Sequence, residues 1–415
     1  MNFSQPQKKH WPLTHKIAFK FVFTYFVLFI LLLLLALFLE APLRWFAKYI
    51  LYWGADFQMG STGSGDRSFD YVRLGLNLVL TLLIGGVWSI SDRKRLSYNI
   101  LFYWFQVILR VFLFLAMLLY GMVKIFKGQF ADASLELLLQ PVGNMSPMGL
   151  AWTFMGHSFA YSFFIGFAEV LGGVLLLYRK TLTLGSMIII GVMTNVAVMN
   201  FTYDIPVKLF SIHLVVMASV LLFADRHRMI NIFFKNKAVE QTNHFVPKMN
   251  ATFKKAISGA KVFVLIVLTL VVIIQGFVRF DLNDQLKSKS EFYGIWESQL
   301  FVKNNDTLMP LLTDSYQWRY LIVNYKHKAA VKKMNDSIDR YQFEIKQELK
   351  DIIFKRNTDS IPQRFSYTFN TPEQLQLRGT LDGDSLYIQF KRKPELDFRL
   401  LNRKFHWVNE STYNY

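Results

Sequence analysis

The sequence predicts a helical membrane protein of about seven transmembrane segments that ends in a separate, small β-domain. Of its 415 residues, 53% are hydrophobic and only 18% are charged, whereas soluble domains are about a quarter charged. The hydrophobic residues also gather into long runs, which indicates that lipid is their solvent. After the last run, the chain changes to short segments in which apolar and polar residues alternate.

Seven apolar runs are each long enough to cross a hydrocarbon core of about 30 Å as a helix that extends slightly past it. The first run follows four lysines but exceeds the apolar region of a signal peptide and lacks a small-residue cleavage site, so we expect an uncleaved helix. The polar linker at 225–261 is expected to form a short interfacial helix. The runs lie at 21–39, 71–90, 97–123, 158–177, 182–201, 207–224 and 262–278.

The basic residues between these runs predict the orientation. With a cytoplasmic N-terminus, the cytoplasmic segments carry 17 Lys and Arg residues and the opposite loops carry 7. Positive charge is enriched on the cytoplasmic side of membrane proteins. Seven crossings then place the β-domain outside the cytoplasm. Most of the formal net charge of +18 comes from residues before the β-domain, where the basic residues lie in loops that meet the lipid headgroups, and no nucleic-acid partner is expected.

The sequence from Asp281 onward predicts β-structure. Short runs rich in aromatic and aliphatic residues occur at 317–325, 364–369, 374–381 and 385–391, and Asp382-Gly383 supplies a hairpin turn between the last two. About eight such strands would form a small barrel or a sandwich. Gly294-Ile295-Trp296 resembles the start of lipocalin-like barrels, in which a late arginine packs on the tryptophan. Arg403 is the expected arginine.

The residue types also exclude several chemistries. The chain has no cysteine, which excludes disulfides, thiol redox chemistry and cysteine-held iron–sulfur clusters within it. No histidine pair has metal-ligand spacing, and no nucleophile–base–acid trio is recognisable. No metal site is therefore predicted, and whether the chain is an enzyme stays open.

Two ionisable residues within apolar runs are the strongest site candidates. Arg110 lies about midway along the third run and Glu169 about midway along the fourth. A charge at mid-membrane is costly unless it is paired, so we expect the two to pair across the helical hairpin. Such a pair would either fix the helix register or take part in proton transfer, and the sequence leaves both readings open.

A second group of polar residues is expected to line a cavity that opens to the outside. The alternative reading is that the lysines and the aspartate anchor helix ends and that the histidines lie at the interface. The group consists of Lys124, His157, Asn195, Asp204, Lys208 and His213.

The order and spacing of these residues resemble the DoxX family of small bacterial membrane proteins. The resemblance covers about 97–230, and the long form with a terminal Phe405-His406-Trp407 resembles DoxX-like proteins of Bacteroidetes-type bacteria. The matching stretches are Leu109-Arg110, 120–124 with Gly121 and Lys124, 168–179 with Glu169, Gly172 and Gly173, Thr183-Leu184-Gly185, Asp204-Ile205-Pro206-Val207-Lys208 and Asp225-Arg226.

The resemblance implies a location in the inner membrane and a four-helix core at 96–230. This core would be flanked by two added helices in 1–95, by a linker and seventh helix in 231–280, and by a periplasmic β-domain at 281–415. Some DoxX relatives are the membrane subunit of a thiosulfate:quinone oxidoreductase, so a quinone is the cofactor that the resemblance suggests.

Three functions remain in competition. The first is an accessory subunit of a membrane redox complex, in which Arg110 and Glu169 handle protons while Lys124 and His213 contact a quinone carbonyl. The second is a non-enzymatic scaffold whose periplasmic β-domain binds an envelope partner. The third is a small-solute transporter, ranked lowest because no inverted repeat or broken helix pair is visible. The lipid bilayer and a protein partner or second copy are the expected partners.

The orientation can be tested with reporter fusions. A reporter that is active only in the periplasm should work when it is fused after Tyr415, because an odd number of crossings separates that end from the cytoplasmic N-terminus. The same reporter should fail when it is inserted within 225–261. The reverse result would contradict the orientation or the number of crossings.

Overall fold

A computed structural model describes residues 10–53, 65–239, 245, 247, 250–286, 290–356, 362–403 and 406–411. The chain divides into two compact units. The first, here called the helical unit, comprises Met1–Phe130 and Pro147–Gly276. The second, the barrel unit, comprises Phe277–Tyr415 together with Ala131–Ser146, a segment that comes from between two helices of the helical unit.

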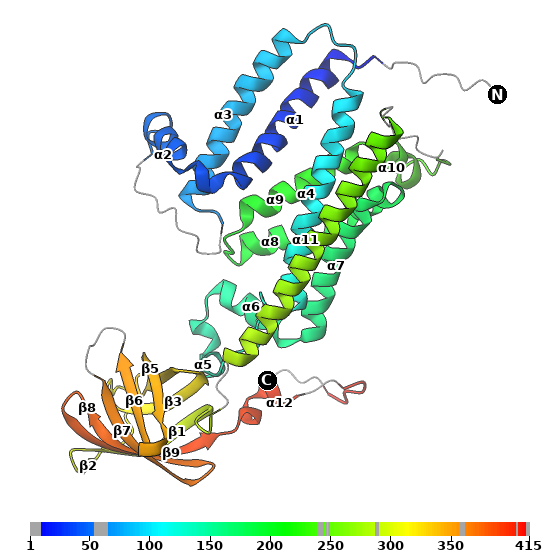
Figure 1. The fold of residues 1–415 in the computed structure, drawn as a ribbon. Coiled ribbons are helices and arrows are strands. Elements are labelled where there is room, and N and C mark those ends of the chain that lie inside the picture. The colour runs from blue at the N-terminus through cyan, green and yellow to red at the C-terminus, as the bar shows by residue number, and fades with distance from the viewer. Residues whose placement is uncertain are drawn as a thin grey trace. The chain divides into compact units, whose positions relative to one another are not determined.

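The helices fall close to the predicted apolar runs (Figure 1). Short 3-10 turns at Ala36–Phe38, Val142–Asn144 and Arg179–Thr181 interrupt the connections between them. The longer helices are α1 (Leu13–Leu34), α2 (Glu40–Tyr49), α3 (Ser68–Ser91), α4 (Asn99–Ile125), α6 (Pro147–His157), α7 (Phe159–Leu177), α8 (Leu182–Thr202), α9 (Lys208–Phe223), α10 (Arg226–Phe233) and α11 (Ala251–Leu286).

Five helices within the described residues are long and apolar enough to cross a membrane, namely α1, α3, α4, α7 and α8. Helix α9 follows at the position of the sixth predicted run and meets α10 at a bend of 81°. Helix α10 is the short helix predicted in the linker, and its place at the membrane interface stays a prediction. Helix α11 covers the seventh run and contains an apolar stretch at Leu265–Val278. A multi-pass membrane protein is therefore supported, and the number seven stays a prediction.

Aromatic side chains hold the N-terminal helices to α4. Phe19 and Phe23 of α1 contact Phe105 of α4 with ring centroids 6.0 and 5.4 Å apart. The ammonium of Lys20 donates hydrogen bonds to the carbonyls of Trp88 and Asp92 at the end of α3. The first third of α4 thus packs with α1 and α3, so only the remainder of α4 can pack against other helices.

Helix α2 was not expected from the sequence. It lays Leu43, Phe46 and Ala47 against Val72 of α3, while Trp45 on its other face is 57% exposed. Its ten residues are too few to cross a membrane, but amphipathic helices with exposed tryptophan are typical of the membrane interface.

The second unit contains a closed, antiparallel barrel of eight strands in sequence order, which decides between the predicted barrel and the predicted sandwich. Strands β1 and β9 pair to close it, and the short β2 extends β1 outside the ring. The strands are β1 (Gly294–Lys303), β2 (Asp306–Thr307), β3 (Trp318–Tyr325), β4 (Lys328–Lys333), β5 (Ile338–Lys346), β6 (Asp351–Arg356), β7 (Gln363–Thr371), β8 (Gln374–Leu381) and β9 (Asp384–Lys393), followed by α12 (Arg399–Asn402).

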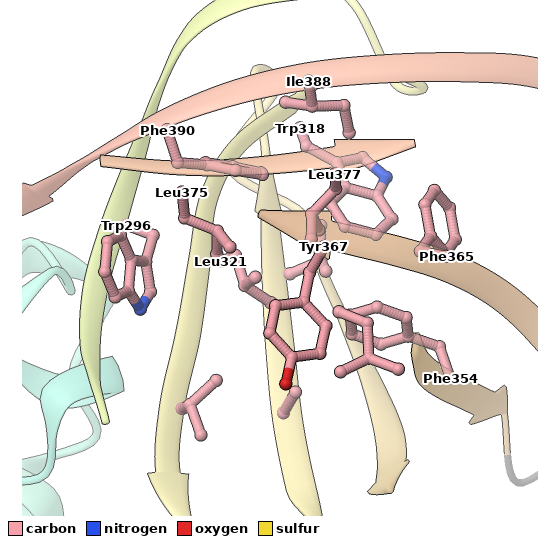
Figure 2. Packing of buried hydrophobic residues seen from close by; sticks show 14 of the residues in the cluster. Trp296, Trp318, Leu321, Phe354, Phe365, Tyr367, Leu375, Leu377, Ile388 and Phe390 are labelled. Carbon is pink, nitrogen blue, oxygen red and sulfur yellow. The ribbon is translucent and has the colours of Figure 1, made fainter. Parts of the chain in front are cut away.

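Large apolar side chains fill the barrel. Figure 2 shows Trp318, Phe354 and Phe365 meeting inside it, and all three are at most 1% exposed. An eight-stranded barrel is just wide enough for its own side chains. The predicted hairpin turn is present, because Asp382 and Gly383 both have positive φ, 53° and 92°, as a type I′ turn requires.

Trp296 opens the first strand of the barrel as predicted, but its arginine partner was assigned wrongly. Trp296 is fully buried, and the guanidinium of Arg392 lies 4.5 Å from its ring centre. The pairing of β1 with β9 places these two residues directly opposite each other. Arg403 lies beyond the last strand and donates instead to Asn409. A residue outside the barrel wall cannot use strand pairing to reach the tryptophan.

The segment Ala131–Ser146 packs on the outside of the barrel. Leu135 of the short helix α5 (Leu135–Leu138) is buried with Ile295, Tyr320 and Ile322 of β1 and β3. Glu136 forms an ion pair with Arg340 of β5 at 2.9 Å. The connection that follows α4 is thereby fixed to the wall of the barrel.

This attachment can be tested in a chain that has no natural cysteine. Paired cysteines placed by Glu136→Cys and Arg340→Cys should be joined efficiently by a short bismaleimide, because the native side chains touch. Cross-linking is measured by the mobility of protein cleaved between the two sites. A control pair at Glu136 and Asp382 should give little product, since β5 and not the β8–β9 turn carries the contact. Equal cross-linking of both pairs would contradict the packing.

Candidate functional site

Helices α4 and α7 approach closely at two glycines. A Cβ atom added to Gly121 would lie 2.5 Å from the carbonyl oxygen of Gly166, and one added to Gly166 would lie 2.6 Å from that of Gly121. Any larger residue would force the two backbones apart. Close approach at small residues is a common way for membrane helices to associate, and here it sets the register between α4 and α7.

A buried ion pair spans this contact, because Lys124 follows Gly121 by one turn on α4 and Glu169 follows Gly166 by one turn on the antiparallel α7. The ammonium of Lys124 donates to both carboxylate oxygens of Glu169 at 2.7 and 2.8 Å. Lys124 is 4% exposed and Glu169 is 1% exposed. The ammonium also lies 5.5 Å from the ring centre of Tyr120. Two-point contact and burial make this a strong, charge-assisted interaction that neither partner can lose without leaving a buried charge.

The predicted pair of Arg110 with Glu169 is wrong. Arg110 donates from Nε to the carbonyl of Leu176 at 2.6 Å and from a terminal nitrogen to that of Leu177 at 2.8 Å. These carbonyls belong to the last turn of α7, where a helix has no internal partners for them. A cation is also favourable at this negative end of the helix dipole. Arg110 therefore caps α7.

The error came from assuming that the two helices meet at their midpoints. Helix α4 has 27 residues and α7 has 19, and the first third of α4 packs with α1 and α3. The end of α7 consequently lies beside Arg110, while the middle of α7 lies beside the last turns of α4. The resulting register brings Lys124, and not Arg110, to Glu169.

The ion pair lines a cavity of about 900 Å³ between α4, α6, α7, α8 and α9. Asn195 of α8 also lines this cavity, whereas most other lining side chains are apolar or aromatic. The cavity reaches the outer surface of the bundle, because its lining includes Phe164, which is 64% exposed, and Gly191, which is also exposed. Gly191 lies in the middle of α8, and Phe164 lies in the second turn of α7.

The remaining predicted residues lie elsewhere. His157 is exposed at the end of α6. Asp204 forms an exposed ion pair with Lys208 at 2.8 Å, and the hydrogen bond from that ammonium lowers the pKa of the aspartate. Neither residue lines the cavity of Lys124 and Glu169. The ion pair of Asp204 with Lys208 fits the alternative prediction, in which these two residues anchor helix ends.

His213 also lies outside this cavity. Its Nδ1 is 2.6 Å from the carbonyl of Leu209, and its Nε2 is 2.6 Å from the hydroxyl of Tyr25. A carbonyl only accepts, so Nδ1 carries the proton and Nε2 accepts from the tyrosine hydroxyl. His213 therefore joins α9 to α1, and the single cavity predicted for all six polar residues is not formed.

Sequence reasoning missed several polar residues of the cavity wall, among them Tyr120, Asn200 and Ser211. Tyr120 lies one turn before Lys124, and Asn200 donates to the hydroxyl of Ser211 at 3.1 Å. An asparagine and a serine in consecutive apolar runs were a usable signal, because polar groups in membrane helices face other helices or water. Tyr120 carried no such signal among so many aromatic residues.

The fold and this site define a multi-pass membrane helix bundle with a buried lysine–glutamate pair and a β-barrel domain. No protein-family model and no solved structure matches the chain. Over 124 residues it is 37% identical to the uncharacterized protein YwoB of Bacillus subtilis (strain 168), an alignment that covers 30% of this chain and 79% of the relative. The chain belongs to the YwoB family.

The ion pair predicts a specific pattern of stability. Lys124→Met and Glu169→Gln should each destabilise the protein by about 3–5 kcal/mol, because each leaves a buried polar or charged group without its partner. The double substitution should cost clearly less than the sum. Unfolding in detergent, followed by circular dichroism, measures the three values.

A second pair of substitutions serves as the control. Arg110→Gln combined with Glu169→Gln should be additive within about 0.5 kcal/mol, because the two side chains have different partners. Strong coupling between Arg110 and Glu169, or additivity between Lys124 and Glu169, would contradict the register described above.

Proposed function

We propose that this protein is an accessory membrane subunit that binds an amphipathic small molecule of the quinone class in the cavity beside Lys124 and Glu169. The observation that carries the proposal is a buried ion pair on the wall of a large, mostly apolar cavity that opens toward the lipid. Ligand sites are typically concave and apolar with a few placed polar groups. Intramembrane charges are, by default, functional candidates.

The polar groups of the cavity suit a carbonyl acceptor. An ammonium has three N–H donors, and the carboxylate of Glu169 accepts two of them. The third donor of Lys124 is then available to a quinone oxygen, and the amide of Asn195, which lines the cavity from α8, offers another. Glu169 would balance the charge of Lys124 and accept a proton when the bound molecule changes its protonation state.

The DoxX resemblance supports the same class of ligand, although Lys124 replaces Arg110 as the partner of Glu169. Without cysteine, and without a recognisable flavin or haem site in its sequence, the chain would depend on a partner subunit for electron transfer. We therefore place it as an accessory subunit and not as an autonomous enzyme.

The attachment of α5 to the barrel supports the proposed orientation. Residues 131–146 belong to the barrel unit, so the barrel and the α4–α7 connection lie on one side of the membrane. Three crossings by α1, α3 and α4 put this side opposite to the N-terminus. The loop charges favour a cytoplasmic N-terminus, which supports a periplasmic barrel.

A scaffold is the second candidate function. The interior of the barrel is filled by its own side chains, so its outer surface is the part available to an envelope partner. In this reading the helices anchor the barrel and the cavity holds only lipid.

The two functions are separated by quinone binding. Protein in lipid nanodiscs should bind a short-chain naphthoquinone, measured by equilibrium dialysis and chromatography of the bound fraction. Gly191→Leu should weaken this binding about tenfold or more, because the side chain enters the cavity and displaces the ligand. A Cβ atom at Gly191 would meet nothing within 4 Å, so the substitution fills space without a clash.

Gly86→Leu is the matched control. Gly86 also lies in an apolar helix with nothing within 4 Å of an added Cβ atom, but it does not line the cavity. The Gly86→Leu variant should bind the quinone as well as the wild type does. If neither the wild type nor the control binds the quinone, the redox proposal fails and the scaffold remains.

A further inference from the structure

A second cavity lies between α1, α3, α4 and α9. Its volume is about 550 Å³. The walls are chiefly apolar and include Phe29, Leu74, Phe112 and Leu115, while Asn77 and His213 are among the few polar side chains. Of the candidate site residues named from the sequence, only His213 lines this cavity.

Most of the polar groups around this cavity already have partners. Arg73 pairs with Asp70 at 2.7 Å. Asp66 accepts hydrogen bonds from the backbone amides of Lys208 and Leu209, at 2.5 and 2.9 Å, and so caps α9. His213 uses both of its ring nitrogens, as described above. These groups build the cavity and have little capacity left for a ligand.

Asn77 is different. It lines the cavity and is 1% exposed, yet neither its amide nitrogen nor its amide oxygen has a hydrogen-bond partner among the described residues. Burying an unpaired amide in an apolar setting is unfavourable. A fold that keeps such a group beside a cavity has a donor and an acceptor ready for an occupant.

We infer that this second cavity is a binding site for a lipid-like alcohol, an elongated apolar molecule whose single polar end is a hydroxyl group. A hydroxyl both donates and accepts, so it can donate to the amide oxygen of Asn77 and accept from its nitrogen. A charged end group is disfavoured, because Arg73 and Asp70 already neutralise each other at the start of α3. The apolar walls receive the remainder of the molecule.

This site is separate from the cavity of Lys124 and Glu169. The two cavities share a wall formed by Leu119, Tyr120, Val207 and Phe210. The rings of Tyr120 and Phe210 lie with their centroids 5.9 Å apart in this wall. Their contact divides the two spaces, so each can be blocked without filling the other.

Photolabelling tests the inference. A long-chain alcohol that carries a diazirine should label peptides of α1, α3, α4 and α9 in the nanodisc-embedded protein, and its methyl ether, which accepts but cannot donate, should label them about tenfold less. Asn77→Leu should bring the alcohol down to the level of the ether. Gly191→Leu should leave this labelling unchanged, whether or not the other cavity binds quinone. Equal labelling of the wild type by the alcohol and the ether would overturn the inference.

Thr81→Val is the matched control. Thr81 lies one turn beyond Asn77 on α3, is 5% exposed and has an unpaired hydroxyl, but it does not line the cavity. It should not change the labelling. Without a probe, Asn77→Leu should melt at or above the temperature of the wild type, because it removes an unsatisfied amide. A lower melting temperature, or an equal loss of labelling in Thr81→Val, would show that Asn77 is structural and would overturn the assignment.

Discussion

The close approach of α4 and α7 at Gly121 and Gly166 is the constraint on which the rest of the helical unit depends. In a membrane, lipid is as apolar as leucine, so helices associate through packing and polar contacts instead of the hydrophobic effect. The two facing glycines allow the helices to pack closely and to form polar contacts. Their contact lets the side chains of Lys124 and Glu169 meet. Because the helices are antiparallel, it also aligns Arg110, eleven residues before Gly121 on α4, with Leu176, ten residues after Gly166 on α7.

The same register explains why a cavity forms beside the ion pair. The backbones of α4 and α7 are held together on one side, whereas Asn195 and Gly191 on α8 lie across an open space. Gly185 and Gly172 hold α8 against the other end of α7, since a Cβ atom at Gly185 would lie 3.0 Å from the carbonyl oxygen of Gly172. Close contact at one end and a cavity between the other ends leave a wedge-shaped space that reaches the surface of the bundle.

Much of the fold could be predicted from the sequence, because charge-free apolar runs and strand alternation are local signals. The helix ends at Ser91 and Leu177 fall at the expected places, and the Asp382-Gly383 turn does too. The errors concern pairing, which is not local. Arg110 and Arg392 find their partners through helix register and strand pairing, and neither is visible in a single stretch of sequence. Helix α5 was missed because four residues carry no periodicity.

The segment that contains α5 also limits how the chain can cross the membrane. Both ends of the stretch from Pro147 to Gly276 lead into the barrel unit, so we expect this stretch to begin and end on one side of the membrane. Helices α7 and α8 are long and apolar enough for two crossings. In that arrangement, α9 and α11 would either both cross or both remain on that side. Helix α11 carries an apolar stretch at its centre and α9 packs along α8 within the bundle, which favours two further crossings and an even total of four.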